Sequence, residues 1–271
     1  MRVFCGIIYR LFVIALYFFI LSSCEKADDI VKDSPLKPVN VIAHRGYWRF
    51  EGAAQNSIAA LKNAGELGIY GSEFDVWKTK DDRLVVNHDK LFHELLIVDT
   101  IFDDLTKDCL RLDNGEKIPT LEEFLEVAHL YPKLRLVLEL KTLGDSEYNK
   151  KAVDLVIDSV LKHGSENNID FISFSYEICK LFAESKVGSG VEYLGGGYTV
   201  KELFETGITG INYSYTRIIE NPTLVGEANA LGMNVTAWTV DNVEDVRRLI
   251  EIGIDKITTN NPMHIYELFG I

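Results

Sequence analysis

The chain has 271 residues, of which 47% are hydrophobic and 25% are charged. This length and balance are typical of one large folded domain and exclude a chain that is disordered over most of its length. The 41 acidic and 28 basic residues give a net charge of −13. Such a charge argues against a surface that binds DNA or RNA, so we expect no nucleic-acid partner, and no pattern predicts a protein partner.

Residues 1–23 are expected to be a signal peptide and not part of the fold. Arg2 and Arg10 precede an apolar run over residues 11–21, and no acidic residue occurs in this segment. A basic start followed by a short apolar run is typical of a secretory signal. A membrane-spanning helix needs about 20 apolar residues, so this run is too short to be one.

The end of this segment, Leu21-Ser22-Ser23-Cys24, resembles the bacterial lipobox. The resemblance implies that Cys24 is acylated and anchors an exported protein to a bacterial membrane, on the periplasmic side or at the cell surface. A plain secretory signal with an incidental cysteine is the alternative. Residues 24–38 are polar, contain two prolines and are expected to be a tether. The folded domain is therefore predicted over residues 39–271.

Eight short apolar runs, separated by segments of helical period, predict alternating strands and helices. Eight βα units in about 230 residues predict an α/β fold of the (β/α)8 TIM-barrel type. A doubly wound open sheet is the alternative, but no G-x-G-x-x-G motif follows the first strand. The expected strands are Val39–Ala43, Gly71–Trp77, Leu134–Leu140, Phe171–Phe174, Val191–Leu194, Gly210–Tyr213, Met233–Thr239 and Asp255–Thr258.

Capping residues mark several expected helix ends. Asn56 is expected to be the N-cap of a helix that ends before Gly68, and Thr120-Leu-Glu-Glu123 has the pattern of a capping box. The other expected helices are Tyr148–Leu161, Tyr176–Ser185 and Asn242–Ile252, the last of which Gly253 follows.

Residues 84–118, between the second and third expected strands, are too many for a simple connection. Leu84-Val-Val-Asn87 predicts a short extra strand or extended loop within them. We therefore expect an insertion, or a lid, over the functional site.

Ionisable residues gather at the ends of the first three expected strands. A His-Arg pair follows the first strand, two carboxylates alternate on the second, and a Glu and a Lys alternate at the end of the third. Each of these residues, taken alone, could be an ordinary solvent-exposed residue at the rim of the barrel. Because the carboxyl ends of barrel strands meet at one mouth, they together predict one pocket formed by His44, Arg45, Glu73, Asp75, Glu139 and Lys141.

Three carboxylates without an adjacent cluster of histidine or cysteine suit one hard divalent cation, Ca²⁺ or Mg²⁺, better than zinc. The other histidines, His93, His129, His163 and His264, are interpreted as ordinary surface or packing residues. Cys109 and Cys179 have no metal-type spacing and are interpreted as buried or incidental thiols, with a disulfide between them left open.

Six ordered motifs resemble the glycerophosphodiester phosphodiesterase family, in its bacterial, lipoprotein-type form, over about residues 40–265. The resemblance implies a barrel, one divalent metal, and hydrolysis of a small glycerophosphodiester to glycerol phosphate and an alcohol head group. The motifs are His44–Gly46, Ser72–Val76, Leu84–Asp89, Leu138–Lys141, Ala237–Val240 and Ile257–Pro262.

By the same resemblance, the metal ligands are Glu73, Asp75 and Glu139. Arg45 and Lys141 are expected to bind the nonbridging phosphate oxygens, where positive charge would stabilise the transition state.

The resemblance further implies that His44 and His88 form an acid-base pair, and we assign His44 as the base and His88 as the acid. Trp238 is expected to stack on the glycerol or on the head group; alternatively, it caps the barrel core.

One motif departs from the family pattern. Ala54-Gln55-Asn56-Ser57 stands where the family usually has Pro-Glu-Asn-Thr, so Gln55 is a neutral amide in place of a carboxylate. With a divalent metal and a phosphodiester bound, the expected site is then electrically neutral. We expect this change to affect metal affinity and substrate preference.

Two other functions remain open at this point. An intramolecular transferase of the sphingomyelinase D or phosphatidylinositol-phospholipase C type would leave a cyclic phosphate. A lipid-anchored protein could instead bind a phosphodiester without cleaving it. The presence of both His44 and His88 argues against the binding protein, because holding a phosphate requires cations and no acid-base pair.

Overall fold

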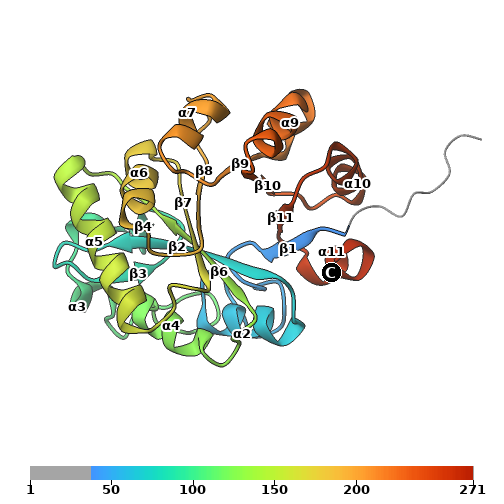
Figure 1. The fold of residues 1–271 in the computed structure, drawn as a ribbon. Coiled ribbons are helices and arrows are strands. Elements are labelled where there is room, and N and C mark those ends of the chain that lie inside the picture. Colours follow the sequence, from blue (N-terminus) through green and yellow to red (C-terminus); the bar gives the residue numbers. More distant parts are fainter. Residues whose placement is uncertain (1–37, 271) are drawn as a thin grey trace, which may run out of the picture. The chain divides into compact units, whose positions relative to one another are not determined.

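In the computed structural model, which describes residues 38–270, eight parallel strands close into a barrel (Figure 1). The first strand pairs with both the second and the last, so the barrel is closed and the open-sheet alternative is excluded. Every strand lies within two residues of its predicted bounds. The barrel strands are β1 (Asn40–Ala43), β2 (Gly71–Lys78), β6 (Arg135–Leu140), β7 (Ile169–Ser173), β8 (Gly190–Tyr193), β9 (Gly210–Ser214), β10 (Asn234–Trp238) and β11 (Lys256–Thr259).

Helices lie outside the strands and cover the barrel (Figure 1). The predicted capping box is present, with Thr120 and Glu123 each bound to the backbone of the other. The helices are α2 (Ile58–Leu67), α4 (Leu121–Ala128), α5 (Ser146–Lys162), α6 (Tyr176–Ser185), α7 (Val200–Glu205), α8 (Tyr215–Glu220), α9 (Thr223–Ala230), α10 (Val243–Ile252) and α11 (Pro262–Phe269).

The predicted N-cap of α2 is wrong by one residue. Ser57, and not Asn56, accepts the hydrogen bond from the Ala60 backbone N–H. Asn56 has a positive φ of 58° and a buried side chain that points to β2, where it binds Asp75. A tertiary hydrogen bond therefore takes the side chain that local capping rules assign to the helix.

Residues 84–118 form a packed insertion beside the barrel. Its β3 (Leu84–Val86) pairs antiparallel with β2, as predicted, and β4 (Leu91–Phe92) pairs with β5 (Leu95–Leu96). A 3-10 turn, η1 (Ile97–Asp99), and α3 (Phe102–Leu105) follow. The insertion has its own hydrophobic cluster, formed by Trp77, Val85, Phe92, Ile97, Leu105 and Ile118. Burial of these side chains anchors the insertion to β2.

An apolar layer crosses the barrel interior. Ile42, Val137, Ile172 and Leu194 are buried and in contact, each from a different strand or strand end. Such layers of branched side chains fill the interior of barrels of this type. The interior is therefore packed, and a cavity can form only at a mouth of the barrel.

A charged layer lies toward the N-terminal ends of the strands. Asp170 and Glu192 each precede an apolar-layer residue by two positions, so they face the same interior one level lower. Lys256 Nζ lies 2.7 Å from Glu192 Oε1 and 3.4 Å from Asp170 Oδ2. Arg135 Nη1 lies 3.9 Å from Asp170 Oδ1. Two acids therefore meet two cations in this layer.

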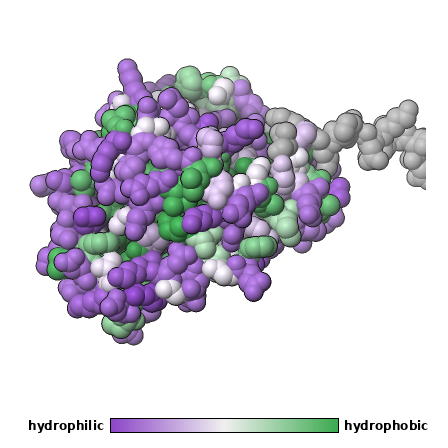
Figure 2. Space-filling model, turned by 90° about the horizontal axis from the view of Figure 1, so that it is seen from below, coloured by the Kyte–Doolittle hydropathy of each residue, from purple (hydrophilic) through white to green (hydrophobic). Residues whose placement is uncertain are grey.

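Hydrophilic side chains cover most of the face in Figure 2. Of the helices within residues 38–270, none is long and apolar enough to cross a membrane. The predicted signal peptide, residues 1–23, lies outside the described residues, as do Cys24 and all but the last residue of the predicted tether.

Candidate active site

Three buried carboxylates meet at the C-terminal mouth of the barrel. Glu73 and Asp75 share one face of β2, and Asp75 is the direct register partner of Glu139 on β6. Each offers an oxygen, and these oxygens all lie within 4.8 Å of one another. The exposed fractions are 3% for Glu73, 1% for Asp75 and 7% for Glu139. The structure thus brings together the three acids that the strand pattern placed in one pocket.

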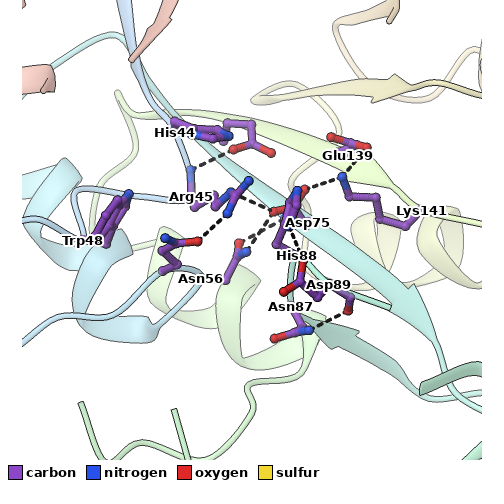
Figure 3. A network of polar contacts seen from close by, with 12 residues as sticks. His44, Arg45, Trp48, Asn56, Asp75, Asn87, His88, Asp89, Glu139 and Lys141 are labelled. Atoms are coloured by element: carbon purple, nitrogen blue, oxygen red, sulfur yellow. Dashed lines mark hydrogen bonds and ion pairs between the residues drawn. The ribbon is translucent and has the colours of Figure 1, made fainter. Parts of the chain in front are cut away.

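Two cations, Arg45 and Lys141, lie next to Asp75 (Figure 3). Lys141 Nζ lies 3.0 Å from Asp75 Oδ1 and 2.6 Å from Glu139 Oε1. Arg45 Nε is buried without a hydrogen-bond partner and lies 3.9 Å from Asp75 Oδ2. The Arg45 backbone N–H donates to Glu73 Oε2 at 2.8 Å. Positive charge therefore concentrates on Asp75, and Glu73 receives only a backbone hydrogen bond.

The pKa values of the acids follow this uneven distribution. Burial, together with the nearby carboxylates, holds the pKa of Glu73 well above its ordinary value. Burial and the Asp75 charge raise the pKa of Glu139 to about 7. Burial alone would also raise the pKa of Asp75, but Lys141 and other groups outweigh it, so this pKa is lowered. The cluster has three acids and two cations, and carboxylate oxygens at this spacing fit a hard divalent cation.

His44 follows β1 directly, and an amide fixes its ring. His44 Nδ1 lies 2.9 Å from Asn260 Oδ1, which also accepts from Trp48 Nε1 at 3.3 Å. Asn260 Nδ2 donates to Asp241 Oδ2 at 2.9 Å, so the orientation of the Asn260 amide is defined. Nδ1 of the neutral ring therefore carries the proton, and Nε2 keeps its lone pair. Burial, followed by the Arg45 charge, lowers the pKa of His44 to about 4.

His88 comes from the insertion, two residues after β3. Its Nδ1 lies 2.7 Å from Asp89 Oδ1, and its backbone carbonyl accepts from Trp77 Nε1 at 3.3 Å. The His88 side chain is 36% exposed. The insertion thus supplies a histidine to the barrel mouth, and its partner is a carboxylate, in contrast to the amide beside His44.

A cavity of about 160 Å³ is lined by all the expected pocket residues except Asp75. Both histidines, both cations, Glu73 and Glu139 line its polar side. Ile172, Phe174, Leu194 and Trp238 line the other side. The site is therefore amphipathic, with a charged face opposite an apolar wall.

Trp238 lines this cavity and also packs against the apolar layer of the barrel. Its Nε1 donates to the Asn212 carbonyl at 2.9 Å, and its ring meets Phe174 edge-on at 5.6 Å. The two alternatives weighed for Trp238, ligand contact and core packing, are thus geometrically compatible.

Sequence reasoning missed three polar residues that orient the site. Asn56 donates to Asp75 Oδ2 at 2.8 Å and accepts from the Asp75 backbone N–H at 3.1 Å. Asn260 and Asp241 hold His44, although both come from loops that follow other strands. Asn260 does stand in the Ile257–Pro262 motif, so the motif was the available signal.

Gln55 contacts the arginine and not the acids. Its Oε1 accepts a hydrogen bond from Arg45 Nη1, and its side chain is exposed. A change at this position reaches the carboxylate cluster only through Arg45.

Cys109 is exposed and Cys179 is buried, and both are free thiols, so the disulfide left open above does not form. Burial raises the pKa of Cys179 to about 12. Neither cysteine lines the active-site cavity.

Comparisons with known proteins point to one family and support the barrel fold. Residues 44–264 match the model of the "Glycerophosphoryl diester phosphodiesterase family". A glycerophosphodiester phosphodiesterase of Caldanaerobacter subterraneus subsp. tengcongensis is 32% identical over 84% of this chain and 96% of its own length. The crystal structure of a glycerophosphodiester phosphodiesterase from Parabacteroides distasonis is 40% identical, with a TM-score of 0.83 over 86% of this chain and 98% of that one. A phosphodiesterase of Oleispira antarctica in complex with the product sn-glycerol-3-phosphate is 25% identical, with a TM-score of 0.73 over 85% and 96% of the two chains.

Proposed function

The chain belongs to the glycerophosphoryl diester phosphodiesterase family, and from this premise we propose that it hydrolyses a glycerophosphodiester with one divalent cation and a pair of histidines. The observation that carries the proposal is one cavity lined by two histidines, two cations and two carboxylates of a buried cluster of three. The Oleispira antarctica structure, which contains sn-glycerol-3-phosphate, supports a small glycerophosphodiester as the substrate.

Glu73, Asp75 and Glu139 would hold the cation through their clustered oxygens. When bound, a Ca²⁺ or Mg²⁺ ion supplies charge that stabilises the phosphate oxygens in the transition state. Arg45 and Lys141 would bind nonbridging phosphate oxygens, since both line the same cavity. Their positive charge also lowers the repulsion between the anionic substrate and the carboxylate cluster.

His44 is the base in this proposal. Asn260 Oδ1 accepts a hydrogen bond from the His44 Nδ1–H, so Nε2 is free to take a proton from a water molecule as the water oxygen bonds to phosphorus. His88 is the acid. It gives a proton to the head-group oxygen as the bond between that oxygen and phosphorus breaks. The products are glycerol phosphate and the free alcohol, and one water is consumed.

The alternatives are less well supported. A transferase would retain a cyclic phosphate, and a binding protein would need no acid-base pair. Neither is named among the relatives above. Phosphorus NMR of the products, with glycerophosphodiesters incubated with and without divalent cation, tests the proposal: glycerol phosphate is expected only with cation, and a cyclic phosphate would instead support transfer.

We also propose that the protein is exported and held on a bacterial membrane by acylated Cys24, as a lipoprotein-type member of its family. The support is the motif Leu21–Cys24 after a basic and apolar segment. Cys24→Ala should move the protein from the membrane fraction to the soluble exported fraction, whereas a variant that stays with the membrane would contradict the anchor.

A further inference from the structure

A second cavity, of about 280 Å³, adjoins the active-site cavity. Residues 54–56, before α2, form one wall, and residues of the insertion form the rest. His88 lines both cavities. A ligand that contacts His88 in the active-site cavity therefore has room to extend past this ring into the second one.

The two cavities offer different surroundings to the two halves of a phosphodiester. The active-site cavity has an apolar wall that includes Phe174 and Trp238, which suits the carbon face of glycerol. In the proposed reaction, His88 protonates the leaving oxygen, so the head group lies on the His88 side of the phosphate. We propose that the second cavity is the subsite for the leaving head group, an inference that rests on the proposed function.

Two acids give this subsite its charge. Asp89 uses one oxygen for His88 Nδ1, and its side chain is 79% exposed. Asp113 is exposed and forms no hydrogen bond or ion pair with any residue between 38 and 270. An ammonium group in the cavity would thus find a free carboxylate at Asp113 and a second carboxylate at Asp89.

Arg111, the cation that lines the subsite, is already engaged. Its Nη2 lies 3.3 Å from Asp108 Oδ1, and its Nη1 donates to the Leu110 carbonyl at 3.0 Å. Its guanidinium therefore does not offer the free pair of donors that an anionic head group such as a carboxylate requires.

Aromatic faces for a quaternary ammonium are also missing among the described lining residues. Phe92 is 5% exposed and packs edge-on against His93 at 4.7 Å. Recognition of a quaternary ammonium relies on open aromatic faces. The subsite therefore favours a head group with a primary ammonium, of the ethanolamine type, over choline, serine or an uncharged polyol.

The test compares kcat/KM for glycerophosphoethanolamine, glycerophosphocholine and glycerophosphoglycerol in the wild type and in Asp113→Asn. The substitution keeps the size of an exposed side chain and removes only the charge. We expect kcat/KM for glycerophosphoethanolamine to fall about tenfold, the scale of one charge-assisted hydrogen bond, and that for glycerophosphoglycerol to change less than about twofold. Asp103→Asn is the matched control, because Asp103 is an exposed acid on α3 that lines neither cavity.

An equal change for all three substrates in Asp113→Asn, or no change, would overturn the subsite. A wild-type preference for glycerophosphocholine would overturn it too and would place the head group against the apolar wall. If the wild type hydrolyses none of the three diesters, the proposed function itself fails and the inference fails with it. Hydrolysis without ammonium selectivity leaves the proposed function standing and rejects the inference alone.

Discussion

Two charged clusters inside the barrel differ in the balance between their acids and their cations. In the layer near the N-terminal ends of the strands, Lys256 contacts Glu192 and Asp170. The second oxygen of Glu192 accepts from Asn212 and Thr236 at 3.0 and 2.8 Å. Burial opposes the charge of Lys256, but the two acids outweigh it and raise its pKa. This layer, with Arg135, is balanced in charge.

The cluster at the mouth is not balanced. Within residues 38–270, three acids, Glu73, Asp75 and Glu139, face two cations, Lys141 and Arg45. Burial, followed by the charge of the neighbouring carboxylates, raises the pKa values of Glu73 and Glu139. Leaving a buried charge without a partner costs a protein several kcal/mol. Both clusters are buried, so burial alone does not distinguish the functional site of this protein, whereas the excess of negative charge at the mouth does. We infer that a divalent cation completes the mouth.

The largest effect that separates the two clusters is expected on removal of the cation. Excess EDTA should lower activity by on the order of 10³-fold or more, because the cation stabilises charge in the transition state. Activity should return on addition of Ca²⁺ or Mg²⁺. Initial rates of hydrolysis measure both the loss in EDTA and the recovery. Ala in place of Glu73, Asp75 or Glu139 should have a similar effect and lower cation affinity, with the circular dichroism spectrum as the control for folding. Full activity in EDTA would contradict the claim that the unbalanced cluster binds a catalytic divalent cation.

The histidines provide the second prediction. An alkoxide needs a proton to leave phosphorus, whereas a nitrophenolate leaves without one, and general-acid catalysis contributes about 10²–10⁴-fold. His88→Ala should lose this factor on a glycerophosphodiester and far less on a nitrophenyl phosphodiester. His44→Ala should lose activity on both, because both reactions need an activated water.

Kinetics of both variants on both substrates decide the roles. A reversed pattern would exchange acid and base, and near-wild-type activity in either variant would reject the two-histidine mechanism. His163→Ala is a suitable control, because His163 lies at the end of α5, with Nδ1 2.8 Å from the Ser159 carbonyl, and does not line the active-site cavity.

The eight strands could be predicted because each is a short apolar run, and the pocket could be predicted because strand ends in a barrel converge. Asn56 could not, since Asn and Ser at consecutive positions are both good N-caps and only the contact with Asp75 decides between them. The link from Asp241 through Asn260 to His44 joins three loops and leaves no local pattern. The partners of Lys256 lie 64 and 86 residues away in the sequence, so no local pattern predicts these contacts either.

A smaller effect is expected at the rim of the unbalanced cluster. Gln55→Glu would place a carboxylate on Arg45 and add one negative charge near the mouth. Cation binding should tighten and the Michaelis constant for the anionic substrate should rise, each by roughly three- to tenfold for a partly screened charge. Isothermal titration calorimetry with Ca²⁺ measures the cation affinity, and steady-state kinetics measure the Michaelis constant. Unchanged values for both would mean that position 55 does not act on the site.

The stability of the metal-free protein tests whether the carboxylate cluster at the mouth has an excess of negative charge. The pKa of Glu139 is raised, so its ionisation destabilises the fold: stability is fully present below the unfolded-state pKa and is lost as the pH rises through about 7. Glu139→Gln should therefore raise the unfolding temperature in EDTA at pH 8 by several degrees and have little effect at pH 5.

Glu192→Gln, in the balanced layer, should lower the unfolding temperature at both pH values, because the substitution removes one of the two acids that pair with Lys256. Added Ca²⁺ or Mg²⁺ should stabilise the wild type more than Glu139→Gln. A Glu139→Gln variant that is less stable than the wild type in EDTA at pH 8 would contradict the claim that the mouth has an excess of negative charge without a bound divalent cation.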